Sequence, residues 1–557
     1  MKTIKLILLA VSALFCITVH AQEYFWASAA GGGGNDATEL IVRDKTGNIY
    51  ASGYFYSPAC IFQTDTLYCH GNNDSFIVKY NPAGQEIWVR QLGLRENVAG
   101  APETISGMVF DSLDETLLVT GTFYRALILP DTIIYGNHLD VFVLKMDLDG
   151  NVLWARTGGG EHEDVSMGIT CDEQENVYIS GSNAFEATFG NTTIPRGGFL
   201  AKYNKSGELM WAKNKFRYYD YSSDPIYTEA PPIHLTFSNQ HLMVYGSILN
   251  DSLVVDTITL AGIWGFNSSY LASFDPEGQI EWLTKVGGAP YNDRGKGPIA
   301  RDPDGNFYLT GSFEVIGIYG NDTLTTSGKN INDIFLTKVA PDGSFLWATQ
   351  GFSNSFAGGH YALCDEDGNV YVVGVYTDSV TFGGQTLVSH AEMDLFLVSY
   401  TSDGLFRGLF PFINTGVKCL AFDLAGNLVL GGVFEDALEL GSTTLISHGL
   451  YDSFVAKCSP ITSTKESPAG PSDRLLIYAN PTTGKCNITI PDEFRHEKEL
   501  TLYIYDSQGR LVQQAAIKEA EGTYRLDIRA QAAGIYQAVL SNGTKRYSGK
   551  IVFAKGE

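Results

Sequence analysis

The chain has 557 residues, of which 44% are hydrophobic and 18% charged, and its formal net charge is −24. This length and apolar content allow more than one domain and a large buried core, and they exclude the disordered and fibrous classes. The negative charge argues against a nucleic-acid partner, because binding to phosphates requires clustered Lys and Arg. The 60 glycines, 30 tyrosines and 31 phenylalanines favour an all-β protein with many tight turns.

Residues 1–21 have the features of a signal peptide. Lys2 and Lys5 precede an apolar run over 6–19, and Ala21 ends a small-residue cleavage site. The run is too short for a stable membrane span, so we expect no transmembrane segment in the mature chain. The cysteines beyond this segment are scattered and form no disulfide framework, and Cys60 with Cys69 is the one plausible local pair.

A turn-and-strand sequence then recurs seven times, at spacings of 58 to 68 residues. The first copy reads Gly-Asn-Ile-Tyr-Ala-Ser-Gly, and a short apolar strand that usually ends in Asp precedes each copy. The Asp-x-x-Gly-Asn link between the two strands predicts a tight hairpin turn. The copies span 47–53, 115–121, 175–181, 240–246, 305–311, 368–374 and 426–432.

Two further strands complete each repeat. The third carries Asp-x-Phe-x-x-Lys, as at Asp74 to Lys79, and the fourth places Trp four residues after a turn glycine, as at Trp88. Four antiparallel strands repeated seven times predict a seven-bladed β-propeller over 22–459. The mature chain begins with an unpaired fourth strand near Tyr24, and the last repeat stops after its third strand near Cys458. We therefore expect the N-terminal strand to complete blade seven and close the ring.

These motifs resemble the seven-bladed β-propeller repeat family of bacterial exported proteins. The resemblance covers roughly 22–459 and implies the fold. It implies no particular function, because propellers serve as enzymes, binding modules and scaffolds.

The residues after the ring form a linker and a second β-domain. Residues 460–473 are polar and rich in Pro and Ser, and the alternating patterns over 474–557 predict a small β-sandwich. This region resembles the type A sorting domain of type IX secretion systems, which are found in Bacteroidota. The matching residues are Asn480, Pro481, Gly484, Asp506, Gly509, Gly534, Tyr536 and Lys550. The resemblance implies the type IX secretion machinery as a partner, and a secreted protein or one held on the outer-membrane surface.

No motif of nucleophilic catalysis, phosphate binding or zinc binding is present, so the sequence does not point to an enzyme and leaves any catalytic residues unassigned. We expect no cofactor and no metal. The repeated histidines His70, His390 and His448 and the Asp-x-Asp-Gly segments favour turns over ligand sets. Asp-Thr-Leu/Ile resembles an O-glycosylation sequence of Bacteroidota, and it also fits a turn, so both interpretations stay open. It occurs at Asp65, Asp131, Asp256 and Asp322.

A ligand is expected on the face that holds the connections between blades and those between second and third strands. The longest connection between blades, 214–231, is rich in aromatic and acidic residues, which either bind a ligand or pack over their own blade. The candidate residues are Tyr218, Tyr219, Asp220, Tyr221, Tyr227, Glu163, Asp164, Tyr291, Asp293 and Arg294, with Glu161, His162 and Asn292 beside them.

The function that fits these observations is a secreted or cell-surface binding module for a glycan or a protein. A polysaccharide hydrolase or lyase using the propeller funnel, and a structural adhesion scaffold, are the alternatives.

Overall fold

A computed structural model of the protein describes residues 23–554 apart from a set of internal positions. These positions are 71, 94–103, 130–131, 219–232, 249–251, 262–267, 288–298, 327, 329–330, 413–414, 461–474, 476, 479–481, 492–493, 496–498, 507–510, 519–521 and 543–545. The named elements are all β-strands, which confirms the expected class. Within the described ranges, no helix has the length and apolar character needed to cross a membrane.

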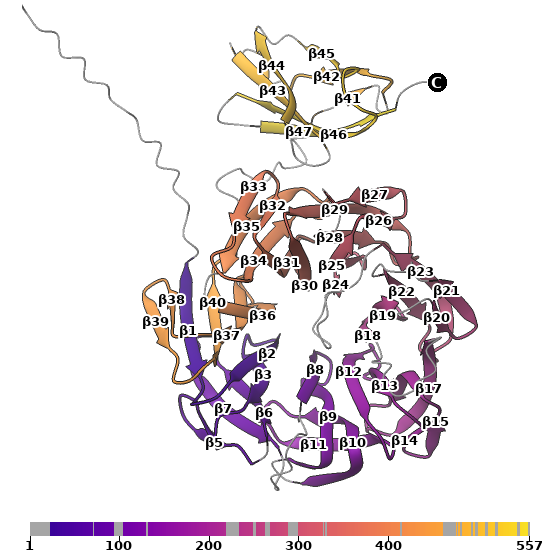
Figure 1. Ribbon diagram of the computed structural model, residues 1–557, viewed down its shortest axis with the longest axis vertical. Coiled ribbons are helices and arrows are strands. Elements are labelled where there is room, and N and C mark those ends of the chain that lie inside the picture. The colour runs from indigo at the N-terminus through magenta and orange to yellow at the C-terminus, as the bar shows by residue number, and fades with distance from the viewer. Residues whose placement is uncertain are drawn as a thin grey trace, which may run out of the picture.

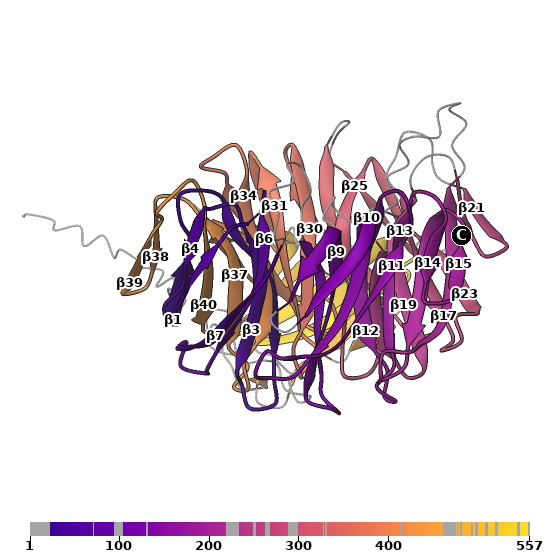
Figure 2. The same ribbon diagram turned by 90° about the horizontal axis from the view of Figure 1, so that it is seen from below.

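Seven antiparallel blades of four strands each stand around a common axis (Figures 1 and 2). From the axis outward, blade 1 consists of β2 (Asp36–Arg43), β3 (Ile49–Phe55), β6 (Asp74–Tyr80) and β7 (Glu86–Leu92). Blade 2 consists of β8 (Thr104–Asp111), β9 (Thr116–Ile128), β10 (Ile133–Met146) and β11 (Val152–Gly159). Blade 3 consists of β12 (Asp164–Cys171), β13 (Val177–Asn183), β16 (Gly197–Tyr203) and β17 (Leu209–Tyr218). Blades 4 and 5 are β18 (Ile233–Ser238), β19 (His241–Ile248), β22 (Ser268–Phe274), β23 (Ile280–Val286); and β24 (Ile299–Arg301), β25 (Phe307–Glu314), β28 (Asn332–Val339), β29 (Phe345–Ser353). Blades 6 and 7 are β30 (Phe356–Cys364), β31 (Val370–Thr377), β34 (Asp394–Tyr400), β35 (Phe406–Phe412); and β36 (Thr415–Phe422), β37 (Leu428–Phe434), β40 (Asp452–Cys458), β1 (Tyr24–Ala30).

The N-terminal strand closes the ring, as the half-repeats at the two ends of the array predicted. β1 pairs antiparallel with β40, from Tyr24 opposite Cys458 to Ala30 opposite Ser453. In Figure 1 the indigo strand β1 lies beside the orange strand β40. The pairing extends one step further, because the Ser459 N–H donates to the Glu23 carbonyl oxygen at 2.7 Å. Closure leaves neither end of the array as an open edge.

Short hairpins between the second and third strands reach from a blade to the outer strand of the preceding blade. β14 pairs with β11, β20 with β17, and β32 with β29. In blade 2 the hairpin is continuous with β9 and β10. The other hairpins are β4 (Ala59–Ile61) with β5 (Thr66–Tyr68), β14 (Ala187–Phe189) with β15 (Thr192–Ile194), β20 (Ser252–Val255) with β21 (Ile258–Ala261), β26 (Ile316–Tyr319) with β27 (Asp322–Thr325), β32 (Ser379–Phe382) with β33 (Gln385–Val388), and β38 (Ala437–Leu440) with β39 (Thr443–Ile446).

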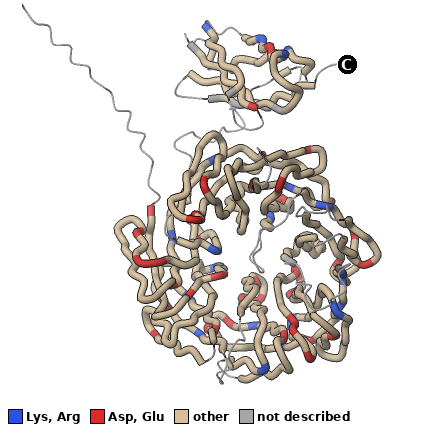
Figure 3. Tube along the Cα trace, viewed as in Figure 1, with Lys and Arg blue, Asp and Glu red and all other residues tan. Residues whose placement is uncertain are grey.

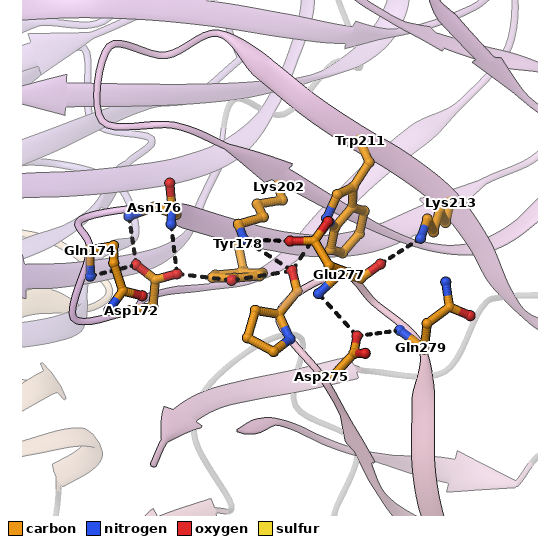
Figure 4. Close-up of polar contacts among 11 residues, drawn as sticks. Asp172, Gln174, Asn176, Tyr178, Lys202, Trp211, Lys213, Asp275, Glu277 and Gln279 are labelled. Carbon is orange, nitrogen blue, oxygen red and sulfur yellow. Dashed lines mark hydrogen bonds and ion pairs between the residues drawn. The ribbon is translucent and has the colours of Figure 1, made fainter. Parts of the chain in front are cut away.

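The repeated Lys and Trp join each blade to the next. In blade 3, Lys202 Nζ and Trp211 Nε1 both donate to the carbonyl oxygen of Pro276, which lies in a turn of blade 4, at 3.1 and 3.3 Å (Figure 4). Beneath them the Tyr178 hydroxyl donates to Asp172 at 2.9 Å. The same pair of donors shares one carbonyl oxygen of the next blade at Leu148, Ser402 and Pro82. The motifs that identify the repeat are therefore contacts between blades.

The C-terminal region forms two small sheets around its own core. One contains β41 (Ile477–Tyr478), β42 (Lys485–Thr489) and β45 (Thr523–Asp527), and the other contains β44 (Leu511–Lys518), β43 (Glu499–Asp506), β46 (Gly534–Ser541) and β47 (Arg546–Phe553). Its buried cluster draws only on residues from Leu475 to Phe553. Tyr536 is buried there, and its hydroxyl donates to the Ala532 carbonyl oxygen at 2.6 Å. The expected small β-sandwich is confirmed.

Candidate functional site

The two faces of the ring differ in how the chain reverses. The loop-rich face carries the connections between blades and the hairpins between second and third strands, whereas the turn face carries the tight turns. The Asp-x-Asp-Gly segments lie on the turn face and close hairpins. Asp147 Oδ1, for example, accepts the N–H groups of Asp149 and Asn151 at 3.0 and 2.8 Å. Their carboxylates therefore serve the turn itself.

The repeated histidines also belong to turns. The backbone N–H groups of His70, His390 and His448 each donate to the Asp four residues later, at 3.1, 2.7 and 2.9 Å. Each histidine is thus associated with the aspartate of its own blade. The described residues contain no group of three or more His, Cys, Asp and Glu side chains arranged to hold a metal ion.

The Asp-Thr-Leu/Ile segments lie in the hairpins. Asp65 Oδ1 accepts the Thr66 N–H at 2.7 Å, Asp256 has a φ of 52° in the turn between β20 and β21, and Asp322 begins β27. Asp131 lies outside the described residues. Turn geometry accounts for the three described copies, and glycosylation stays a prediction.

Most of the ligand residues predicted from the sequence lie outside the described part of the chain. These are Tyr219, Asp220, Tyr221, Tyr227, Tyr291, Asp293 and Arg294. Tyr218 is the last residue of β17. Glu163 is exposed on the loop-rich face, whereas Asp164 begins β12 and is buried.

Exposed and half-buried aromatic side chains lie on the loop-rich face along four consecutive blades, from blade 7 through blade 1 to blades 2 and 3. We call this set the aromatic arc, and it consists of Tyr451, Tyr54, Tyr56, Tyr124 and Phe185. Tyr56 and Tyr124 both stand three residues after the repeated glycine that ends the second-strand motif, at Gly53 and Gly121. Tyr451, Tyr56 and Phe185 are 43%, 42% and 52% exposed. Aromatic groups held open to solvent at neighbouring positions are typical of ligand-binding surfaces.

The seam between blades 7 and 1 brings together residues that are far apart in sequence. The Tyr56 N–H donates to the Asn35 carbonyl oxygen at 3.0 Å, and the Asp36 N–H donates to the Tyr451 carbonyl oxygen at 2.8 Å. The rings of Tyr54 and Tyr56 meet edge to face with centroids 5.6 Å apart. Backbone pairing on both sides of Asn35 therefore places three tyrosines on one seam.

An ion pair between residues at two β-bulges joins blades 7 and 1 at this seam. Glu39 of β2 and Lys418 of β36 are each the extra residue where the register shifts. Lys418 Nζ lies 2.6 Å from Glu39 Oε1 across the seam and 5.8 Å from the centroid of the Tyr54 ring. Bulges redirect side chains and are frequent next to functional sites. Here they place a charged pair beside the aromatic arc.

The seam between blades 2 and 3 holds the other end of the arc. His162 lies over Phe185 with ring centroids 4.0 Å apart and an interplanar angle of 31°. The Ala184 N–H donates to the Glu163 carbonyl oxygen at 3.0 Å, which fixes this pair of connections together. The sequence-based candidates His162 and Glu163 therefore lie beside Phe185, an aromatic residue that the sequence analysis did not select.

Two buried carboxylates meet at the same seam, below the surface. Asp140 begins the blade-2 copy of the third-strand motif and is 4% exposed, and Asp164 is 1% exposed. A Cβ placed on Gly159 would lie 2.2 Å from Asp140 Oδ1 and 3.0 Å from Asp164 Oδ2, so the glycine makes room for both groups. Burial, assisted by the charge of Asp140, raises the pKa of Asp164 to about 8. Their burial separates these acids from a polymeric ligand, so they belong to the packing of the seam.

Sequence motifs carry little information about the arc. Its residues fall just outside the repeated strands, in connections whose lengths differ between blades, so they do not align as a motif. One signal was available: aromatic residues at the same distance from the repeated glycine in blades 1 and 2.

Comparison with protein families identifies the C-terminal region. Residues 476–554 match the secretion system C-terminal sorting domain family, which confirms the sorting domain expected there. Of the residues that carried this resemblance, Gly484, Asp506, Gly534 and Tyr536 lie in or beside the strands of the two sheets, and Lys550 lies in β47. Asn480, Pro481 and Gly509 lie outside the described residues. The sorting domain supports export of the chain, to the medium or to the cell surface.

The propeller has more distant similarities. An uncharacterized WD repeat-containing protein of Acanthamoeba polyphaga mimivirus is 23% identical over 411 residues, which are 64% of this chain and 25% of that protein. The chain thus spans a quarter of this relative's length. Among solved structures, the Dos1 propeller covers 78% of this chain and 95% of its own at 11% identity and a TM-score of 0.38. A PL25 ulvan lyase covers 77% and 96% at 10% identity and a TM-score of 0.40. The propeller assignment itself comes from the strand pairing described above.

Proposed function

We propose that this protein is an exported binding module that recognises a glycan, or a segment of a partner protein, through the aromatic arc on its loop-rich face. The observation that carries the proposal is the run of aromatic rings along four consecutive blades, in which Tyr451, Tyr56 and Phe185 are exposed and Tyr124 is half-buried. Planar rings provide stacking surfaces for sugar rings and contact area for peptides at low entropic cost. The charged and polar groups beside them, such as Lys418 and His162, supply hydrogen bonds.

In this proposal the binding surface lies outside the cell, and the sorting domain supports that location. The signal peptide would direct passage across the inner membrane, and the type IX secretion machinery would recognise the C-terminal domain. Removal of that domain would release the propeller, and attachment to surface lipopolysaccharide would hold it at the cell. Both destinations expose the loop-rich face to extracellular polymers and proteins.

The test is a binding screen of the mature chain against polysaccharides and glycoproteins, with a variant that replaces Tyr56, Tyr124 and Phe185 by Ala. Aromatic residues are enriched among the interface residues whose truncation costs more than about 1 kcal/mol, so we expect the loss of three rings to weaken saturable binding by at least about tenfold. The matched control replaces Leu113 and Leu424, two exposed apolar residues in turns on the turn face, by Ala. A ligand bound equally well by both variants would exclude the arc as its site.

The same screen, with product formation followed in parallel, distinguishes the binding module from an enzyme and from a structural scaffold. Product formation from a bound polysaccharide would assign the protein as a hydrolase or lyase. A further variant with Tyr218, Tyr219 and Tyr221 replaced by Ala tests the loop selected from the sequence. No saturable binding to any polymer or glycoprotein would favour a structural scaffold.

A further inference from the structure

We infer that the blade-2 part of the aromatic arc is an anion subsite, and that the ligand is an acidic polysaccharide carrying carboxylate or sulfate groups. The inference rests on the proposed function, because it assigns a ligand class to the same surface. It is carried by three residues of one hairpin, namely Tyr124, Arg125 and Tyr135, with His138 packed against Tyr124.

Arg125 is a cation that forms no ion pair or hydrogen bond with the residues that the structure describes. Its side chain is exposed, and Cζ lies 5.0 Å from the centroid of the Tyr124 ring. No described carboxylate or carbonyl group forms a hydrogen bond or an ion pair with it. Arg156, by comparison, donates to the carbonyl oxygens of Gly207, Ala155 and Ser206. A stacked guanidinium with unused N–H groups matches the paired oxygens of a carboxylate or a sulfate.

The backbone conformation at this position belongs to the repeat, and the side chain is what distinguishes blade 2. Arg125 has a φ of 60° and stands four residues after Gly121. Val315, Asp378 and Asp436 stand at the equivalent position of blades 5, 6 and 7, with φ values of 64°, 62° and 54°. Among these four described blades, only blade 2 places a cation there. The left-handed geometry therefore does not itself indicate binding, but it presents a different chemical group in each blade.

His138 adds an unsatisfied polar atom to the same place. Its ring meets the Tyr124 ring edge to face with centroids 5.2 Å apart, and its Nδ1 atom is buried without a hydrogen-bond partner in the described residues. A buried polar atom without a partner is costly, but this atom is closed to solvent, so it belongs to the packing of the hairpin. Tyr135, which pairs with Ala126 beside Arg125, is 71% exposed. The hairpin thus presents an exposed cation stacked on an aromatic ring, with the exposed ring of Tyr135 beside it.

The charge of the whole chain makes this subsite testable. Lys and Arg are spread among Asp and Glu around the ring in the view of Figure 3, and the net charge is −24. Such a protein repels acidic polymers in general. Retention of an acidic polymer by this chain therefore reports a local cation and not nonspecific adsorption.

The experiment compares polymers that share a backbone and differ in charge. Binding of the mature chain to polygalacturonate is measured against its fully methyl-esterified form, and binding to dextran sulfate against dextran. We expect the charged member of at least one pair to bind about tenfold more tightly, because a hydrogen bond to a charged group has about this effect. Preference within the first pair identifies a carboxylate, and preference within the second identifies a sulfate.

Arg125→Gln is expected to abolish that preference, and Arg125→Lys to retain part of it. Arg301→Gln removes an exposed cation from the turn face and should leave the preference unchanged. Equal affinity for charged and neutral polymers, or a preference that survives Arg125→Gln, would overturn the inference while leaving glycan binding by the arc intact. Tight binding of poly-glutamate alone would overturn it in favour of an acidic protein. Failure to bind any polysaccharide would instead remove the proposed function for glycans.

Discussion

At the scale of single residues, hydrogen bonding of buried aspartates explains why Asp recurs at the start of the third-strand motif. The Asp that starts the third-strand motif accepts backbone N–H groups of its own blade, as Asp394 does from His390 in the preceding connection and Asp333 from Ser353 at the end of β29, both at 2.7 Å. A buried carboxylate needs such donors to offset the loss of water. Asp140 differs from these residues because a second acid, Asp164, lies against it.

The pair predicts a pH dependence of stability. Asp164 has a pKa of about 8 in the folded protein, whereas an unfolded Asp titrates near 4, so the folded state holds a proton that the unfolded chain releases. The contribution of this proton to the free energy of unfolding is fully present below about pH 4 and is lost as the pH rises towards 8. Asp164→Asn removes this dependence. We expect the Tm of the variant, relative to that of the natural protein, to increase as the pH is raised from 4.5 to 8.5.

Thermal unfolding over a pH series measures this difference. Asp65→Asn removes the same charge from an exposed position and is the control. Parallel curves for Asp164→Asn and the natural protein across the whole range would show that the pKa of Asp164 is not raised in the folded protein.

At the scale of elements, the last glycine of the second-strand motif is matched to the bulge in the first strand. A Cβ on Gly53 would lie 1.8 Å from the Ala37 carbonyl oxygen and 2.9 Å from Cζ of Phe76. Gly121 and Gly181 meet the carbonyl oxygens of Thr104 and Val165 in the same way, at 2.1 Å each. The sequence shows the glycine but not the bulge, because the bulge is a register shift between two strands.

Gly53→Ala is expected to destabilise the propeller by about 2 to 3 kcal/mol, because the new methyl group overlaps a backbone oxygen that cannot move without breaking the sheet. Denaturant unfolding followed by tryptophan fluorescence measures the loss. Gly33→Ala is the matched control, since a Cβ at Gly33 meets no atom within 4 Å. Equal midpoints for the two variants would mean that the first strand tolerates a shift at this bulge.

At the scale of the whole molecule, periodicity was sufficient to predict the fold and insufficient to predict the site. Seven repeats and two complementary half-repeats specified the blade number and the closing strand, because every blade must bury the same faces. The arc depends instead on which connections become neighbours, such as those of Tyr56 and Tyr451 on either side of Asn35. Single-sequence patterns do not encode such proximity. Likewise, His138 meets the Tyr124 ring where the register of their hairpin shifts between Tyr135 and Leu139.

The division of the chain predicts separable export and folding. The buried cluster of the C-terminal sheets includes no propeller residue, so deletion of residues 474–557 should leave the propeller folded. We expect the truncated chain to accumulate in the periplasm, because the sorting domain is missing. Cell fractionation and protease treatment of intact cells measure its location, and the Tm of the purified propeller controls for misfolding. Delivery of the truncated chain to the surface would contradict a sorting role for the domain.

The geometry of ring closure also determines how the molecule responds to tension. Glu23 and Ser459 are 436 residues apart in sequence, yet they lie together at one end of the β1–β40 pair. Tension between the two chain ends would load the hydrogen bonds of this pair one after another, starting opposite Cys458, which is the weak direction for an antiparallel pair. Traction on the C-terminal domain alone would not load them in a chain whose N-terminal end is free. A propeller drawn outward by its tail would therefore keep its ring closed, whereas one tethered at both ends would open first at β1.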